Sequence, residues 1–391
     1  MCIENLAFGQ LFLRWRRRHR LESVDEGYGG GVKVEEKRVG GDEMEEEDMK
    51  IKMIKGHLMY FLGNALSSNY YENTCPQVED IVTQVVTEAS KKDKTIPATL
   101  LRVRRFSVTE LQEKHCRKRC PPNVSLHAFY FIDSAKKVIE ALCPGIVSCA
   151  DILAFAARDS VVIISKHYCS SRILELKVDL CLVIVSAKNI WLLEYTESEK
   201  KCYCGQSGGP FWDVPKGRKD GRTSRASETR QLPAPTFNIS QLQQSFSQRG
   251  LSLEDLVALS GGHTLGFSHC SSFSNRIHNF NTTHDVDPTL HPSLAATLKG
   301  ICPLKNRAKN AGIPMDPSST TFDNTYYKLI LQKKSLFSSD QALLSIPKTK
   351  SLVSEFASSK EAFFKAFANS MIKMSSINGG REVRRVCRVA K

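Results

Sequence analysis

The sequence predicts a mainly α-helical fold with a few short β segments. Four stretches carry apolar residues at the three- to four-residue spacing of one helix face. They are residues 80–89, 131–142, 149–157 and 360–371. Alternating strand patterns are scarce, which argues against a sheet-based fold. With 391 residues, the chain is long enough for one large core or two smaller ones.

Short polar residues mark where two of these helices begin. Ser148 directly precedes the pattern at 149–157, and Asp323 precedes a further helix, so both are predicted as N-caps. Residues 1–57 differ from the rest because they combine a basic cluster, a glycine-rich piece and an acidic run without apolar periodicity. We expect residues 1–57 to form a disordered N-terminal extension and the globular part to begin at about residue 66.

The charge balance narrows the classes of partner. The chain has 55 Lys and Arg against 41 Asp and Glu, a formal net charge of +14. No nucleic-acid recognition motif accompanies this charge, and no apolar run reaches the length of a membrane span. We therefore expect neither nucleic acid nor a membrane as a partner. The positive charge predicts an attraction to acidic polymers.

The 13 cysteines favour a secreted protein held by disulfides over a zinc protein. No C-x-x-C pair stands with matching histidines, as a zinc site requires. Three glycosylation sequons, at Asn123, Asn238 and Asn281, agree with secretion. The first thirty residues do not read as a signal peptide, because residues 14–20 are basic where an apolar run is needed.

The most informative stretch is Leu-Ser-Gly-Gly-His-Thr-Leu-Gly-Phe-Ser-His-Cys at 259–270. His263 lies in a glycine-flanked turn that closes a helical pattern at 251–259. Small residues let the backbone approach a large planar ligand, and histidine is a frequent axial ligand of haem iron. Taken alone, His263 is more often an ordinary, partly buried histidine.

Together with other ordered motifs, this stretch resembles plant secretory (class III) haem peroxidases. The further matching motifs are Val147–Leu153, Gly208–Arg222, Leu232–Pro235, Thr321–Tyr327, Leu336–Gln341 and Asn378–Cys387. The resemblance covers residues 66–102, 121–162 and 207–391. It implies a two-domain helical fold with haem b between a distal and a proximal half. It also implies bound Ca²⁺, hydrogen peroxide and phenolic donors as substrates, a monomer, and a location in the cell wall or vacuole.

The resemblance assigns roles to individual residues. His263 corresponds to the proximal iron ligand, and Asp340 to the carboxylate that accepts its other ring proton; alone, Asp340 would be taken for a helix cap or a solvated turn residue. Arg102 corresponds to the distal arginine that polarises the peroxide. Pro233 corresponds to the residue near the haem edge where aromatic donors dock.

A proximal calcium site and three disulfides follow from the same resemblance. The calcium ligands would be Thr264, Asp316, Ser319 and Asp323, whose oxygens suit Ca²⁺. The spacing from Asp316 to Asp323 is slightly short, which leaves Ser318, Ser319 and Thr321 as alternatives. The implied disulfides are Cys75–Cys143, Cys149–Cys387 and Cys270–Cys302, and the implied structural ion pair is Asp151–Arg218.

The distal half departs from the family pattern. After Arg102 the family continues with His-Phe-His-Asp-Cys-Phe and soon Gly-Cys-Asp-Gly-Ser, which supply the distal histidine and a second calcium site. Neither motif is present in this sequence. His115 is flanked by residues that do not resemble the family motif. The sequence thus predicts a retained proximal calcium site, a lost distal one, and no distal general base.

Two segments interrupt the resemblance. One nucleotide sequence that encodes residues 103–111 reads, in a shifted frame, as Cys-Asp-Gly-Ser-Val-Leu-Leu-Asn. We interpret 103–120 as a frame-shifted segment after a misplaced splice junction, and 163–206 as a retained intron, with a genuine loop insertion as the alternative for the latter.

The resulting functional prediction is a haem peroxidase that oxidises phenolic donors, with this chain impaired by the missing distal histidine. Two alternatives remain open: a haem-binding pseudoenzyme, and a basic protein that binds cell-wall polysaccharide.

Overall fold

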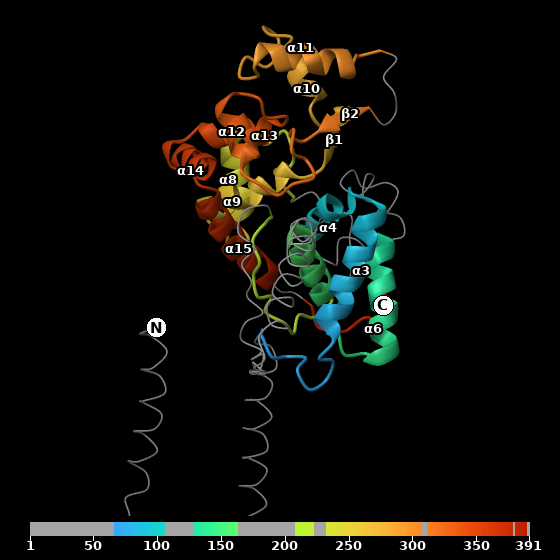
Figure 1. Cartoon of the computed structure of the whole chain (residues 1–391). Coiled ribbons are helices and arrows are strands. Elements are labelled where there is room, and N and C mark those ends of the chain that lie inside the picture. The colour runs from blue at the N-terminus through green and yellow to red at the C-terminus, as the bar shows by residue number, and fades with distance from the viewer. Residues whose placement is uncertain are drawn as a thin grey trace, which may run out of the picture. The chain divides into compact units, whose positions relative to one another are not determined.

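A computed structural model describes residues 66–105, 129–162, 208–222, 232–305, 311–377 and 380–388, with the side chains of 102–105 and 129 excepted. These ranges are mainly helical (Figure 1). The longer helices are α3 (Val78–Lys92), α4 (Ile96–Arg105), α6 (Phe129–Leu142), α8 (Ile239–Ser247), α9 (Leu253–Ser260), α11 (Pro292–Ile301), α14 (Pro347–Ser358) and α15 (Lys360–Ser376). Residues 149–162 form a further helix. The predicted mainly α fold is confirmed.

The predicted caps have different outcomes. Ser148 caps the helix at 149–162, because its hydroxyl accepts from the Asp151 N–H at 3.1 Å. Asp323 lies one residue further out than predicted, since Asn324 holds the N-cap position of α12 (Thr325–Leu331). Its carboxylate still accepts from the Thr325 N–H at 2.8 Å and so satisfies a donor of the first turn.

An aromatic cluster forms the centre of the core between α9, α12, α14 and α15. Phe322 and Phe363 are stacked at 5.3 Å between ring centroids, and Phe367 meets Phe322 edge-on at 4.7 Å. Tyr327 packs edge-on against Phe363 at 5.0 Å. These side chains are at most 1% exposed, so the end of α9 rests on a closely packed surface.

A smaller cluster surrounds the Cys270–Cys302 disulfide. It is formed by η5 (Cys270–Ser272), α10 (Ser274–Ile277) and α11. Strands β1 (Phe267–His269) and β2 (Gly312–Pro314) pair antiparallel, with Ser268 opposite Ile313. These are the minor β segments expected from the sequence.

Among the described residues, disulfides join Cys75 to Cys143, Cys149 to Cys387, and Cys270 to Cys302. These are the pairings that the resemblance implied. The proposed extension at 1–57 and both interrupting segments, 103–120 and 163–206, lie mainly or wholly outside the described residues, which reach only 105 at the first interruption. Across the described ranges, no helix is both long and apolar enough to cross a membrane.

Candidate active site

His263 follows α9 directly, in the short 3-10 helix η4 (Gly261–Thr264). The start of α9 is fixed by a capping box, in which Ser252 and Asp255 satisfy each other's backbone N–H groups. At its other end, a Cβ on Gly261 would lie 2.4 Å from both Phe363 Cε2 and Tyr327 Oη. Glycine therefore lets the His263 turn lie directly on the aromatic core.

Asp340 holds one side of the His263 ring. The Nδ1 atom of His263 lies 2.8 Å from Oδ1 of Asp340, which comes from the short helix α13 (Ser338–Gln341). Asp340 is 2% exposed, whereas the His263 side chain is 24% exposed. The backbone N–H of Phe337 donates to Oδ2 of the same carboxylate at 3.3 Å. The pair joins residues 77 positions apart and fixes which ring nitrogen faces the carboxylate.

Two aromatic rings frame the imidazole edge-on. Phe337 lies 5.2 Å from the His263 ring at an interplanar angle of 84°, and Tyr326 lies 5.8 Å away at 81°. Phe337 directly precedes α13, the helix that carries Asp340, and Tyr326 lies in α12. Tyr326 and Phe337 lie inside the motifs Thr321–Tyr327 and Leu336–Gln341, but nothing in the sequence indicated that their rings flank His263.

Helix α4 passes close to the same turn. Gly266 has a φ of 102°, and a Cβ there would lie 2.9 Å from the Cβ of Ala98. Glycine is required both by this backbone conformation and by the close approach. Arg102 lies one helical turn after Ala98 in α4, but its side chain is outside the described part.

Thr264 brings two carboxylates together immediately after His263. Its hydroxyl lies 2.8 Å from Oδ2 of Asp316 and 3.3 Å from Oδ1 of Asp323. The Ser318 hydroxyl donates to Oδ1 of Asp316 at 3.1 Å, while Ser319 contacts the turn through its carbonyl, which accepts from the Gly266 N–H at 2.9 Å.

The surroundings of the Asp316 carboxyl disfavour its charged form. Burial raises its pKa to about 6, against hydrogen bonds from Thr264 and Ser318 that favour the charged form, and nearby Asp323 adds repulsion. Within the described ranges, no three His, Cys, Asp or Glu side chains gather as a metal site would need. The group is instead two carboxylates supplemented by hydroxyl oxygens.

Pro233 lies exposed in a segment that is fastened to α13. The carbonyl of Pro235, two residues on, accepts from the backbone N–H of Ser339 at 3.0 Å. The structure therefore links the Pro233 segment to the helix that carries Asp340.

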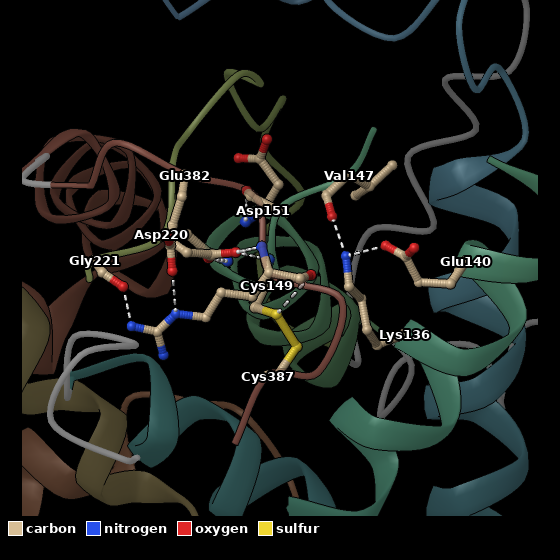
Figure 2. The surroundings of a disulfide bond; sticks show 12 residues. Lys136, Glu140, Val147, Cys149, Asp151, Asp220, Gly221, Glu382 and Cys387 are labelled. Atoms are coloured by element: carbon tan, nitrogen blue, oxygen red, sulfur yellow. Dashed lines mark hydrogen bonds and ion pairs between the residues drawn. A yellow bond between two sulfur atoms is a disulfide. The ribbon is translucent and has the colours of Figure 1, made fainter. Parts of the chain in front are cut away.

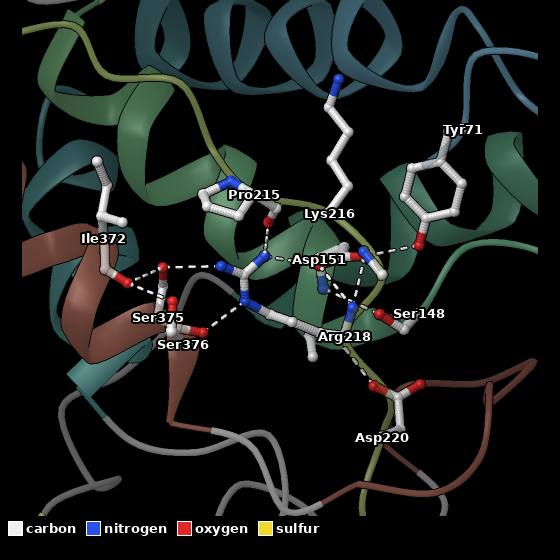
Figure 3. A network of polar contacts seen from close by, with 12 residues as sticks. Tyr71, Ser148, Asp151, Pro215, Lys216, Arg218, Asp220, Ile372, Ser375 and Ser376 are labelled. Atoms are coloured by element: carbon white, nitrogen blue, oxygen red, sulfur yellow. Dashed lines mark hydrogen bonds and ion pairs between the residues drawn. The ribbon is translucent and has the colours of Figure 1, made fainter. Parts of the chain in front are cut away.

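The predicted ion pair between Asp151 and Arg218 is present and fully buried (Figure 3). Arg218 Nη1 lies 2.8 Å from Oδ1 of Asp151, and its Nη2 donates to the Ser375 hydroxyl at 2.8 Å. Oδ2 of Asp151 accepts from the Tyr71 hydroxyl at 2.6 Å. Burial, together with the negative charge of Asp151, raises the pKa of Tyr71 well above its usual range. The Asp151 carboxylate thus joins the segments of Tyr71 and Arg218, and Arg218 extends the network to Ser375 in α15.

A second network, which the sequence analysis missed, surrounds the Cys149–Cys387 disulfide (Figure 2). The Asp220 carboxylate accepts from the backbone N–H groups of Cys149, Ala150 and Arg384 at 2.9–3.0 Å. It therefore caps the helix at 149–162 and also binds the C-terminal segment. Its position 70 residues from the helix hides this role from local sequence patterns.

Comparison with known proteins decides the family. A family model described as "Peroxidase" matches residues 82–359. The chain belongs to the peroxidase family. It is 54% identical over 336 residues to Peroxidase 64 of Arabidopsis thaliana, covering 83% of this chain and 92% of that protein. Peroxidase 66 of the same plant is 43% identical over 80% of this chain and 87% of its own length.

A grape relative, Peroxidase 5 of Vitis vinifera, is 37% identical over 83% of this chain and 91% of its own length. These findings confirm the resemblance to plant secretory peroxidases. As a member of this family the chain is a peroxidase, an enzyme class that uses hydrogen peroxide to oxidise donor molecules and that requires haem and calcium in general.

The residues present around His263 fit haem by the chemistry of their donors. A carboxylate on Nδ1 fixes the tautomer in which Nε2 carries the lone pair that a metal needs. The Thr264 cluster fits calcium, because a cation would offset the cost of burying the Asp316 charge beside Asp323.

Proposed function

We propose that this chain carries the proximal half of a peroxidase haem site, in which His263 would bind the haem iron. The observation that carries the proposal is the 2.8 Å contact between His263 Nδ1 and the buried Asp340 carboxylate. Asp340 fixes the tautomer and the orientation of the imidazole and polarises its Nδ1–H bond. Haem, when bound, supplies the iron at which peroxide is cleaved and donors are oxidised.

On the other side of the site, Arg102 is proposed to stabilise negative charge that develops on the peroxide oxygens. A general base must also take a proton from hydrogen peroxide and return it to the leaving oxygen. The family motif that carries this histidine is missing after Arg102, and His115 lies outside the described residues. We therefore propose that the chain is strongly impaired in peroxide cleavage.

The proposed calcium site uses Thr264, Asp316 and Asp323. Of the candidates Ser318, Ser319 and Thr321, the contact between Ser318 Oγ and Asp316 supports Ser318 as the hydroxyl ligand in place of Ser319. The distal calcium site is proposed to be lost together with the missing motif.

Small phenolic molecules are the proposed donors, and they would dock beside Pro233. The proposed location is extracellular or vacuolar, and the protein is proposed to be a monomer. The disulfides and sequons support secretion. The formal charge of +14 supports a salt-sensitive attraction to acidic cell-wall polysaccharide.

We further propose that residues 66–391 form the peroxidase domain, that 103–120 is frame-shifted and that 163–206 is a retained intron. Sequencing the transcript across both segments tests this organisation. A transcript that restores the distal-histidine motif supports it, and an abundant message that encodes the present sequence contradicts it.

Titration of the purified full chain with haemin, followed by the Soret band, tests the role of His263. We expect weak but saturable binding, and His263→Gln should weaken it by at least roughly tenfold. The matched control is His284→Gln, which changes an exposed histidine whose ring contacts Thr283. Equal haem affinity of His263→Gln and the unaltered chain would overturn the assignment.

A further inference from the structure

Two side chains share a single oxygen of Asp340. His263 Nδ1 lies 2.8 Å from Oδ1, and the hydroxyl of Tyr326 donates to the same Oδ1 at 2.9 Å. The second oxygen, Oδ2, is reached by the backbone N–H of Phe337 at the longer distance of 3.3 Å. The imidazole and the phenol therefore share one hydrogen-bond acceptor atom.

Tyr326 is held where this contact can persist. It lies in the first turns of α12 and is 4% exposed. Its ring stands edge-on to His263 at 5.8 Å and edge-on to Tyr327 at 5.0 Å. Because a buried ring in such packing has little rotational freedom, its hydroxyl is directed at the carboxylate.

The physical effect of a second donor is to weaken the first. A hydrogen bond to a charged acceptor withdraws negative charge from it and leaves less for another donor on the same atom. With the Tyr326 hydroxyl in place, Asp340 pulls less strongly on the Nδ1 proton of His263. The imidazole is then less anionic than the His263–Asp340 distance alone would suggest.

We propose that Tyr326 is a positioning residue that limits how strongly Asp340 polarises His263. Its phenolic hydroxyl donates to the same Oδ1 of Asp340 and so weakens the hydrogen bond between Asp340 and Nδ1 of His263. This inference rests on the proposed role of His263, and it adds a residue through which that role is adjusted.

The first test uses the haem-free full chain and therefore does not depend on haem binding. The readout is the proton resonance on Nδ1 of His263 in ¹⁵N-histidine-labelled protein, assigned by its loss in His263→Gln. Tyr326→Phe should move this resonance downfield, because Oδ1 becomes a stronger acceptor. Asp340→Asn should move it upfield, because the charged acceptor is lost.

Tyr327→Phe is the matched control. Tyr327 is the next residue of α12 and is also buried, but its hydroxyl donates to the carbonyls of Val257 and Ala258 at 2.9 and 3.3 Å. Its loss should lower stability without moving the His263 resonance. If Tyr326→Phe leaves the resonance in place or moves it upfield, or if Tyr327→Phe shifts it equally, the inference is wrong.

The second test uses the chain loaded with haem. Tyr326→Phe should favour the ferric over the ferrous state by roughly tenfold, which is about 59 mV lower in a one-electron potential. A downfield shift without any haem binding would leave the inference intact and contradict the proposed function. Haem binding with neither readout moved by Tyr326→Phe would contradict the inference alone.

Discussion

Gly261 is the point where the turn that carries His263 comes closest to the aromatic core. Its backbone is in the ordinary right-handed helical region, with φ of −59°, so space alone demands glycine there. Gly261→Ala would push a methyl group into Phe363 and the Tyr327 hydroxyl. We expect the free energy of unfolding to fall by about 1–3 kcal/mol, as for other overpacked cores.

Gly300→Ala is the control for this prediction. Gly300 lies in α11, and a Cβ there would meet nothing within 4 Å. Alanine at this position should leave stability unchanged or raise it by up to about 1 kcal/mol. Urea unfolding of both variants checks the pair of predictions, and equal stability of the two variants would show that the Gly261 contact has no energetic weight.

Roles of individual residues were predictable from the sequence only where an ordered motif carried them. His263 and Asp340 were predicted through the motifs around them, and the structure brings them into contact. The role of Tyr326 was not predicted, because its hydroxyl reaches Asp340 only through the packing of α12 against the His263 turn. Local sequence spacing does not show which side chains of different elements meet.

At the scale of elements, Asp255 ties α9 to α15. Its carboxylate accepts from the Ser370 hydroxyl at 2.7 Å and lies 3.0 Å from Lys373 Nζ. Burial by itself would raise the pKa of Asp255, but hydrogen bonds from Ser252, Ser370 and Lys373 outweigh it and lower the pKa. The charged form is therefore the one that stabilises the folded protein.

Asp255→Asn should lower the free energy of unfolding by about 1–3 kcal/mol at neutral pH. Because the folded-state pKa is depressed, this contribution is complete above the ordinary pKa of about 3.9 and disappears as the pH falls through the lowered value. Unfolding curves of both proteins between neutral and acidic pH test this. A stability difference that stays constant down to the lowest pH would contradict it, and Asp213→Asn, at an exposed position, is the control.

Element positions were predictable to different degrees. The helices at 131–142, 149–157 and 360–371 have strong apolar periodicity, and the structure contains them with ends shifted by a few residues. Helices α8, α11 and α14 were not predicted. Local signals mark their starts, with a capping box at Asn238 and Gln241 and proline in the first turn at Pro292 and Pro347.

For the whole molecule, the disulfides connect segments that the chain order separates widely. Cys149–Cys387 spans 238 residues, Cys75–Cys143 spans 68 and Cys270–Cys302 spans 32. A cross-link removes more unfolded-state entropy when the loop it closes is longer. Replacing each pair by serine should cost about 2–5 kcal/mol, with the largest loss for Cys149–Cys387 and the smallest for Cys270–Cys302.

Thermal unfolding of the three double-serine variants checks this order. The Asp220 carboxylate holds the same C-terminal segment by the Arg384 N–H, so part of the structure around Cys387 should persist without the disulfide. A reversed order would show that strain or residual structure, and not loop length, sets the contribution of each bond.

For the whole molecule, we propose that the proximal side of the site is intact and that the distal base is missing. The most direct test of this proposal is the steady-state rate of guaiacol oxidation per bound haem, measured for the purified full chain alongside an intact relative. The loss of general acid–base catalysis predicts a rate lower by roughly 10²–10⁴-fold. A rate per haem equal to that of the intact relative would contradict the account.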